Sequence, residues 1–146
     1  MSDKNIKKAV RESYAKVATW NTVIMSEHNL KKIEKIIKAL ADKNRLRIIY
    51  LLNEKQDLCV CEITDIIGLS QPTISSHLRL LENAGLIESD KDGLWVNYNI
   101  NSRSGLLSRK LMEMICKDLK KDRQIISDRK KLKAVDRDMI CQRGYK

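Results

Sequence analysis

The sequence predicts a mainly α-helical protein with one small β-hairpin. Glycine (5) and proline (1) are scarce among its 146 residues, and the six aromatic residues include no phenylalanine. Apolar residues recur at helical spacing along most of the chain, whereas residues 86–100 have the β-branched and aromatic composition of strands. The hydrophobic residues, 42% of the chain, are enough to form a core. A β-sandwich, a β-barrel and wholesale disorder are therefore disfavoured.

Helices are expected in five segments before this hairpin and throughout the region after it. The five segments cover roughly residues 4–25, 30–40, 46–52, 62–67 and 70–83. The segment 46–52 is apolar on nearly every side, which predicts a buried helix. From Gly105 onward the helical pattern returns, and its apolar stripe continues towards a last short helix near Met139.

Two of these helices and the hairpin together predict a winged helix-turn-helix. The short helix 62–67 ends at Gly68, which suits a left-handed C-cap, and the next helix begins at Ser70, a good N-cap residue. An Asp-Gly turn between strands 86–89 and 94–100 is typical of a hairpin. In this fold the second helix enters the major groove of DNA, where its N-terminal side chains contact base edges.

The candidate DNA-binding residues are the polar side chains of the second helix and the tip of the wing. They are Ser70, Gln71, Thr73, Ser75, Ser76, His77, Arg79 and Lys91. Gln pairs with adenine, Arg with guanine, and Ser or Thr with either base, while a helix N-terminus suits a phosphate. His77 is expected to face DNA, because no partner stands at a metal-ligand spacing from it. The net charge of +10 also indicates a polyanionic partner.

The chain has no segment that predicts export or membrane insertion. No apolar run approaches the roughly 18–20 residues of a membrane span, and the N-terminus has no apolar leader region. We expect a cytoplasmic protein with no membrane partner. In that reducing compartment the cysteines are expected to serve in packing, ligand binding or redox sensing rather than in disulfides. There are four: Cys59, Cys61, Cys116 and Cys141.

Three stretches of the sequence resemble the ArsR/SmtB repressors. Residues 39–48 resemble the family's ALADxxRLxIL signature, residues 69–78 its recognition helix, and residues 83–98 its wing. The resemblance implies a homodimer, formed largely by the first and last helices. It also implies that the dimer binds an imperfect palindrome in double-stranded operator DNA without a cofactor, and that a ligand releases it. We expect an N-terminal helical extension (1–28), the winged helix-turn-helix domain (29–101), and a C-terminal dimerisation helix with a basic tail (102–146).

The segment Asp-Leu-Cys-Val-Cys-Glu-Ile-Thr, residues 57–64, resembles the ELCVCDLC box of the arsenic-sensing branch of that family. The resemblance implies that the thiolates of Cys59 and Cys61 bind arsenic(III) or antimony(III) as the inducer. Thiolate is the soft ligand that such thiophilic centres prefer. The third cysteine of the box is replaced by Thr64. The third sulfur is therefore left to Cys141, Cys116, a thiol of the partner subunit or a small-molecule thiol.

The spacing of Cys59 and Cys61 predicts an irregular backbone at this site. Residues two apart on an α-helix point about 200° apart, whereas in an extended chain they share a face. Binding of one atom by both thiols would therefore demand, or impose, a non-helical segment 59–61. This segment leads directly into the first DNA-reading helix. We expect its distortion to move residues 71–79 out of register with the groove.

Other interpretations of the cysteines stay open. A redox or persulfide-sensing repressor of the same fold could pair Cys61 with Cys116 or Cys141. Of these two, Cys116 is expected to pack beside the apolar stripe of its helix, and Cys141 to be exposed near the terminus. A zinc site on the last long helix is disfavoured because residues 110–127 contain no histidine.

No enzymatic activity is expected. The pair Cys59-x-Cys61 lacks the Cys-x-x-Cys spacing and the βαβ pattern of a thiol oxidoreductase. No Ser/His/Asp set, phosphate-binding glycine loop or paired acids stand elsewhere in the sequence. A constitutive architectural DNA-binding protein is the remaining class, and such a protein would ignore arsenite.

Overall fold

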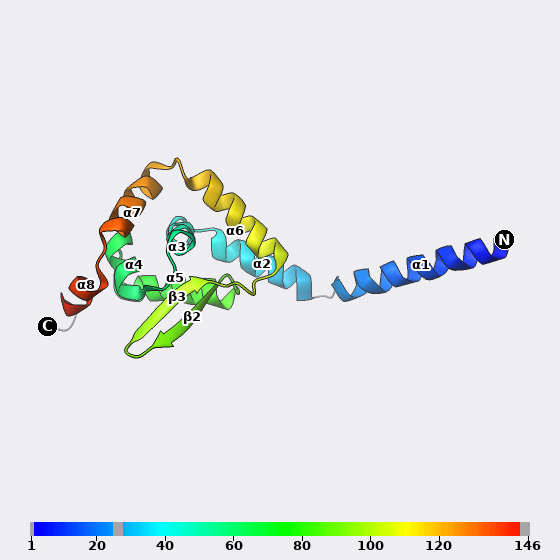
Figure 1. Cartoon of the computed structure of the whole chain (residues 1–146), viewed down its shortest axis with the longest axis horizontal. Coiled ribbons are helices and arrows are strands. Elements are labelled where there is room, and N and C mark those ends of the chain that lie inside the picture. The colour runs from blue at the N-terminus through cyan, green and yellow to red at the C-terminus, as the bar shows by residue number, and fades with distance from the viewer. Residues whose placement is uncertain (1, 25–27, 144–146) are drawn as a thin grey trace. The chain divides into compact units, whose positions relative to one another are not determined.

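The computed structural model describes residues 2–24 and 28–143 and is mostly helical, as predicted (Figure 1). Its elements are α1 (Asp3–Ile24), α2 (His28–Leu40), α3 (Lys43–Glu54), β1 (Leu58–Cys59), α4 (Val60–Ile67), α5 (Gln71–Asn83), β2 (Ile87–Asp92), β3 (Trp95–Ile100), α6 (Leu106–Leu119), α7 (Arg123–Ala134) and α8 (Arg137–Arg143). The chain divides into two units, residues 1–34 and 35–146. Of the polar break expected after the first helix, residues 25–27 lie outside the described part.

The core of the larger unit is built around α3. Residues 48–52 of this helix are at most 1% exposed, which confirms the buried helix predicted from the sequence. The helix begins at the N-cap Asp42, whose Oδ1 accepts hydrogen bonds from the backbone N–H of Asn44 and Arg45 at 2.8 and 3.0 Å. These bonds satisfy two of the N–H groups that every helix start leaves unpaired.

The winged helix-turn-helix forms as predicted. Helix α4 ends at Gly68, which is in the left-handed region with φ +78°, a conformation that costs other residues more. Helix α5 begins at the N-cap Ser70, whose Oγ accepts from the backbone N–H of Thr73. Strands β2 and β3 pair antiparallel to form the wing, and Gly93 has positive φ at their turn.

A third strand, which the sequence analysis missed, completes the sheet. The two residues of β1 pair antiparallel with β3, Leu58 with Tyr98 and Cys59 with Asn97, and the strand order is β1-β3-β2. A strand of two residues is too short to show a period in the sequence. Its consequence is local: Cys59 is held in extended conformation immediately before α4.

The C-terminal region forms three helices that fold back on the others. The apolar stripe predicted from the sequence does not lie on one continuous helix. The first of these helices, α6, ends at Leu119, and Asp122 is the N-cap of α7. Figure 1 shows α7 beside α4, and α7 also contacts α3, while α8 contacts α4. Arg47 of α3 and Asp128 of α7 form a paired hydrogen-bonded salt bridge, with N···O distances of 2.7 and 2.9 Å. Asp128 is completely buried, so this pair ties the C-terminal region to the core.

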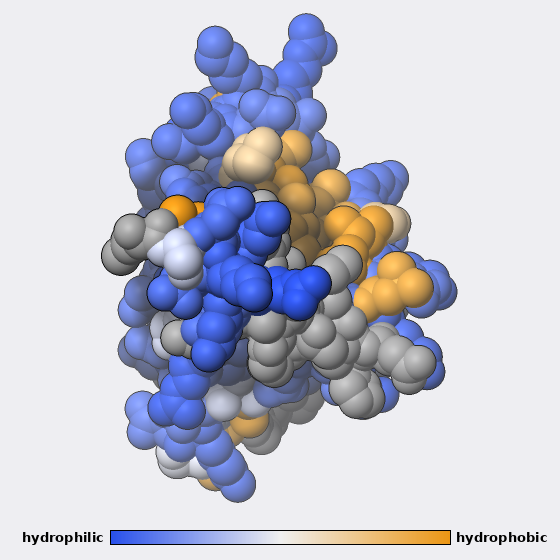
Figure 2. Space-filling view, turned by 90° about the vertical axis from the view of Figure 1, so that its right-hand side faces the viewer, coloured by the Kyte–Doolittle hydropathy of each residue, from blue (hydrophilic) through white to orange (hydrophobic). Residues whose placement is uncertain are grey.

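Exposed large hydrophobic residues occur on several elements of the described chain, including α2 and α6. Figure 2 shows apolar side chains gathered on one part of a surface that is otherwise largely hydrophilic. The exposed large hydrophobic residues of α2 and α6 are Leu30, Ile37, Leu106, Leu107 and Met114. Within the described residues, no helix combines the length and apolar character that a membrane crossing requires.

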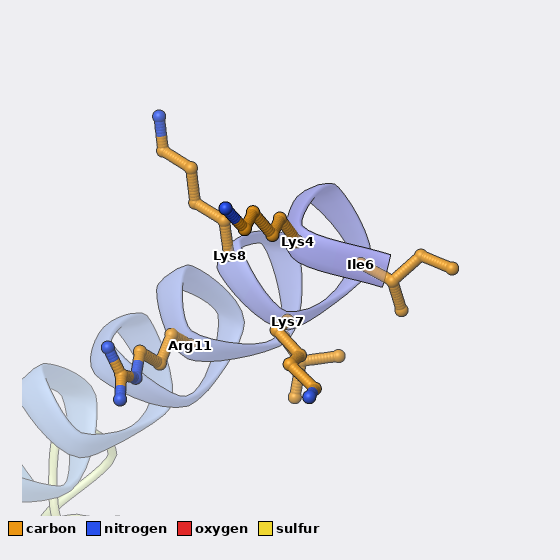
Figure 3. A pocket seen from close by; sticks show the side chains of 6 residues that line it. Lys4, Ile6, Lys7, Lys8 and Arg11 are labelled. Carbon is orange, nitrogen blue, oxygen red and sulfur yellow. The ribbon is translucent and has the colours of Figure 1, made fainter. Parts of the chain in front are cut away.

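Helix α1 is basic at its start. In Figure 3 the side chains of Ile6, Lys7 and Lys8 project in different directions from the helix. The surface hollow that they line together with Lys4 and Arg11 therefore has no set of groups that converge on one point. The structure assigns no chemistry to this part of the chain.

Candidate functional site

Three cysteine thiols lie together at the start of α4. The Sγ atoms of Cys59, Cys61 and Cys141 all lie within 4.8 Å of one another. We call these three residues the thiol cluster. Cys59 is the last residue of β1, Cys61 the second residue of α4, and Cys141 belongs to α8. Cys59 and Cys141 are buried and Cys61 is half-buried.

The backbone at Cys59 explains how two thiols of a Cys-x-Cys pair converge. Cys59 has φ −85° and ψ 164°, which is extended conformation, and the helix starts at Val60. The geometric obstacle of two residues on one regular helix therefore does not arise. The predicted non-helical segment 59–61 is reduced to residue 59, because Cys61 is already helical. The two thiols converge without any unwinding of α4.

The third sulfur of the cluster comes from the far end of the chain. The expectation that Cys141 is exposed is wrong, since the residue is 4% exposed. The physical reason is that α8 packs against α4, which a position near the terminus does not reveal. Thr64, at the third cysteine position of the arsenic-sensing box, supplies no thiol, and its buried Oγ1 has no hydrogen-bond partner among the described residues. Cys116 is not part of the thiol cluster. It lies buried in the core on α6, which confirms the prediction that it packs there.

A buried carboxylate, which the sequence analysis did not single out, connects the parts of the cluster. Glu62 is 1% exposed, and its Oε2 accepts from the backbone N–H of Cys59 at 2.9 Å. The same oxygen accepts from Nη2 of Arg137 at 3.0 Å and from its Nε at 3.3 Å. Oε1 lies 3.5 Å from Nζ of Lys55. The sequence signal was available, because Glu three residues after an N-cap is the pattern of a capping box.

The surroundings of Cys59 and Cys141 raise the pKa of both thiols. Burial, together with the adjacent thiols, raises the pKa of Cys141 to about 12. Burial also raises the pKa of Cys59, and the negative charge of Glu62 adds to this effect. Removal of water disfavours the thiolate because the charged form loses its hydration. At neutral pH Cys59 and Cys141 are therefore thiols.

One more polar atom lies next to the cluster. Asn97, the cross-strand partner of Cys59, is 7% exposed, and its Oδ1 has no hydrogen-bond partner among the described residues. Directly paired residues of antiparallel strands place their side chains on the same face of the sheet. This carbonyl oxygen is therefore on the Cys59 side of the sheet.

The helix predicted to read DNA forms as α5, and most of its candidate residues are exposed. The exposed candidates for DNA binding are Ser70, Gln71, Thr73, Ser76, Arg79 and Lys91, and Ser75 is half-buried. His77 is half-buried, and its Nδ1 lies 3.3 Å from Nη1 of Arg45. Arg45 itself donates to the carbonyl of Ala39 at 2.6 Å. His77 thus contacts α3 through one ring nitrogen, and its role at DNA stays a prediction.

The comparisons with known proteins identify the family. Residues 42–89 match the family described as "Bacterial regulatory protein, arsR family". The arsenical resistance operon repressor of Bacillus subtilis (strain 168) is 42% identical over 84 residues, which cover 56% of this chain and 80% of that protein. The chain belongs to the ArsR family. It is therefore a transcription regulator of the winged helix-turn-helix type, and not an enzyme.

Two further proteins are also similar to this chain. A cadmium resistance transcriptional regulatory protein, a CadC homolog of Staphylococcus aureus, is 39% identical over 77 residues, 53% of this chain and 64% of that protein. The homodimeric winged helix-turn-helix domain of a possible ArsR-family regulator from Mycobacterium bovis has a TM-score of 0.55 at 26% identity, covering 67% of this chain and 92% of that one. Cys59 and Cys61 lie inside the family match, whereas Cys141 lies outside it.

Proposed function

We propose that this ArsR-family protein represses transcription as a homodimer on operator DNA and is released by arsenite or antimonite. The inducer is bound by three sulfurs, those of Cys59, Cys61 and Cys141. The observation that carries this proposal is the convergence of the three Sγ atoms within 4.8 Å of one another. The arsenical resistance repressor of B. subtilis supports the choice of inducer.

The chemistry of arsenous acid fits three cysteine side chains. Each thiol forms one As–S bond, one As–O bond breaks, and the thiol proton leaves with the hydroxide as water. Three thiols and As(OH)₃ therefore give As(SR)₃ and three waters, with no change in charge or oxidation state. Antimony(III) reacts in the same way, since both are thiophilic. The neutral product suits a buried site next to the carboxylate of Glu62.

Divalent cations fit this cluster less well. Zinc in proteins is almost always held by four ligands in structural sites, and the cluster offers three cysteines within the described residues. Three thiolates around a divalent cation also leave a net negative charge, and buried Glu62 lies beside them. Cadmium, suggested by the CadC homolog, is therefore the second choice of inducer.

The DNA complex uses the surface described above. We place Gln71, Thr73, Ser76 and Arg79 at base edges of the major groove, with Ser70 and Lys91 at phosphates and Ser75 beside them. A homodimer reads the two halves of an imperfect palindrome. Ile37 of α2 and the exposed apolar residues of α6 supply surface for that dimer. The protein acts in the cytoplasm, where its operator lies.

Inducer binding acts on the first helix of the DNA-reading pair. The cluster joins the start of α4 to α8, and α4 packs against α5. Because Cys59 is already extended, occupancy changes the position of α4 rather than unwinding it. A coupling of about 1–3 kcal/mol, typical of allosteric proteins, weakens operator binding about 5- to 150-fold.

The test is fluorescence anisotropy of labelled operator DNA with reduced protein at fixed salt, since phosphate contacts make affinity salt-dependent. Arsenite, zinc and peroxide are titrated in parallel. We expect arsenite to release the DNA, and Cys61→Ser to abolish the release. Cys116→Ser is the matched control and should respond as the wild type does. Release by zinc alone would contradict the proposal.

A second candidate function is a thiol redox switch of the same fold. The proximity that serves a metalloid also lets two thiols of the cluster form a disulfide, for example between Cys61 and Cys141. Peroxide would accept two electrons and the two thiol protons and leave as two waters. Release of the operator by peroxide alone, reversed by dithiothreitol, would favour this function over the metalloid sensor.

A further inference from the structure

Helix α8 is attached to the rest of the protein through one of its faces. Arg137 and Cys141 are four residues apart, so they lie one above the other on the same side of the helix. Arg137 is bound to Glu62 and also donates to the carbonyl of Asp57. Cys141 meets the other two thiols. On another face of α8, Met139 is 58% exposed.

A single carboxylate is shared by the two parts of the thiol cluster. Glu62 accepts from the backbone N–H of Cys59 and thereby closes the start of α4, which sets the positions of Cys59 and Cys61. The same Oε2 holds Arg137, and hence the helix that brings Cys141. Glu62 thus touches both the local pair of thiols and the support of the distant one.

The ion pair is also what makes this arrangement electrostatically stable. Glu62 is buried, and a buried carboxylate requires a partner. Arg137 supplies two N–H groups to it, while Lys55 is more distant and more exposed. A guanidinium has a fixed fork of donors, so it fixes direction as well as charge. The orientation of the Arg137 guanidinium towards Glu62 therefore fixes the position of α8.

We propose that Arg137 is a positioning residue of the inducer site: by binding Glu62 it docks α8 so that Cys141 supplies the third sulfur. This inference rests on the proposed function. With α8 undocked, arsenous acid reacts with Cys59 and Cys61 only. Two As–S bonds form, two waters leave and one As–OH remains. The two products differ in mass by one water, and in the number of sulfurs bound to arsenic.

The experiment compares full-length wild type, Arg137→Met, Cys141→Ser and the double variant, all reduced. Arsenite affinity is measured by titration, the bound species by native mass spectrometry, and the sulfur count by arsenic X-ray absorption. We expect three sulfurs in the wild type and two in Arg137→Met. The affinity of Arg137→Met should fall about 10- to 100-fold, the usual cost of removing a residue that supports a metal ligand. Arg137→Lys should restore part of it, and Arg123→Met, the same change at an exposed position of α7, should have no effect.

The double-variant cycle separates positioning from general damage to the fold. If Arg137 acts through Cys141, Arg137→Met should cost little further affinity in the Cys141→Ser background. An equal loss in both backgrounds would overturn the proposal, as would three sulfurs in Arg137→Met. A wild type that binds arsenic through two sulfurs, with Cys141 free, would overturn it and leave the metalloid sensor standing. A wild type that binds no arsenite would refute both. If Arg137→Met fails to fold, Arg137→Gln, which removes the charge but keeps a polar side chain, takes its place in the same cycle.

Discussion

At its N-terminal end α4 meets α8, and at its C-terminal end it meets α7. The first contact consists of the thiol cluster and the Arg137–Glu62 ion pair. At the other end Lys131 donates to the carbonyl of Ile66 at 3.3 Å, and Arg47 to the carbonyl of Ile67 at 3.4 Å. The C-terminal helices thus hold both ends of the first DNA-reading helix.

The two ends differ in the atoms they present. Cations at the C-terminal end bind the last carbonyls of the helix, which is the favourable place for positive charge. Asp128 pairs with Arg47 there, so the charge of this cation is already compensated. The N-terminal end instead gathers three sulfurs, to which the proposed function assigns the inducer. Changes at the C-terminal end of α4 should therefore alter the stability of the protein and leave its arsenite affinity intact. Changes at the N-terminal end should alter arsenite affinity and leave stability nearly unchanged.

The largest expected effect lies at the C-terminal end. Arg47→Met leaves Asp128 buried without its main partner, and breaking such a pair costs about 3–5 kcal/mol. The free energy of unfolding, measured by urea denaturation, should fall by this amount. Arsenite affinity of the folded fraction should stay within about twofold of the wild type. A large loss of arsenite affinity would show that the two ends are not separable.

The next effect lies at the N-terminal end. Cys61→Ser removes a sulfur ligand, and arsenite affinity should fall at least about 100-fold, which is about 2.7 kcal/mol. Stability should change by less than about 1 kcal/mol, because Cys61 is half-buried. Cys116→Ser is the opposite case: it buries a hydroxyl in the core, so stability should fall while arsenite binding is unchanged. Calorimetry of both variants, with and without arsenite, checks that Cys61→Ser loses arsenite affinity and that Cys116→Ser loses stability.

A smaller effect is expected at the start of α3, which is an ordinary helix cap. Burial pushes the pKa of Asp42 upward, but the hydrogen bonds from Arg45 and Asn44 and the charges of Arg45 and His77 outweigh it and lower the pKa. Asp42→Ala should cost about 1 kcal/mol at neutral pH.

The pH dependence of that cost follows from the direction of the shift. A group with a depressed folded-state pKa stabilises the protein above its unfolded value, here 3.8, and loses this contribution as the pH falls through the folded value. The difference between wild type and Asp42→Ala, followed by thermal unfolding, should therefore narrow below about pH 3.8. Asp42→Asn keeps a hydrogen-bond acceptor but has no charge, so the stability that its N-cap contributes should not change with pH. A constant difference across this range would contradict the assigned cap.

The smallest effect concerns Lys131. Its side chain is exposed, and a charge near a helix C-terminus is worth about 0.3–1 kcal/mol. Lys131→Met should lower stability by that amount in low salt and by less in high salt, because exposed charges are screened. Arsenite affinity should be unchanged. A loss of arsenite affinity here would mean that α7, as well as α8, positions the cluster.

The fold was largely predictable because its signals are local. Apolar spacing, Gly68 after a short helix and Ser70 before the next one each act within a few residues, and together they define the winged helix-turn-helix. Strand β1 was missed because two residues carry no period. The break between α6 and α7 was missed because the apolar stripe continues across it, although Asp122 is a recognisable N-cap.

The site was only half predictable, for a different reason. Cys59 and Cys61 are neighbours in the sequence, and their box carries the resemblance. Cys141 is brought to them by tertiary packing across about eighty residues, which no local pattern encodes. One hint at a role for Arg137 was present in the sequence. Arg137 lies four residues, about one helical turn, before Cys141, so the two side chains share one side of a helix. Its partner Glu62 stands at the capping-box position after Cys59.

The measurement that most directly tests the account is arsenite affinity of the free protein and of the protein bound to operator DNA. Coupling between two sites is reciprocal, so operator must weaken arsenite binding by the same factor by which arsenite weakens operator binding. We predict a factor of about 5–150 in both directions for the wild type. Equal arsenite affinities with and without operator would contradict the claim that the thiol cluster at the start of α4 controls DNA binding.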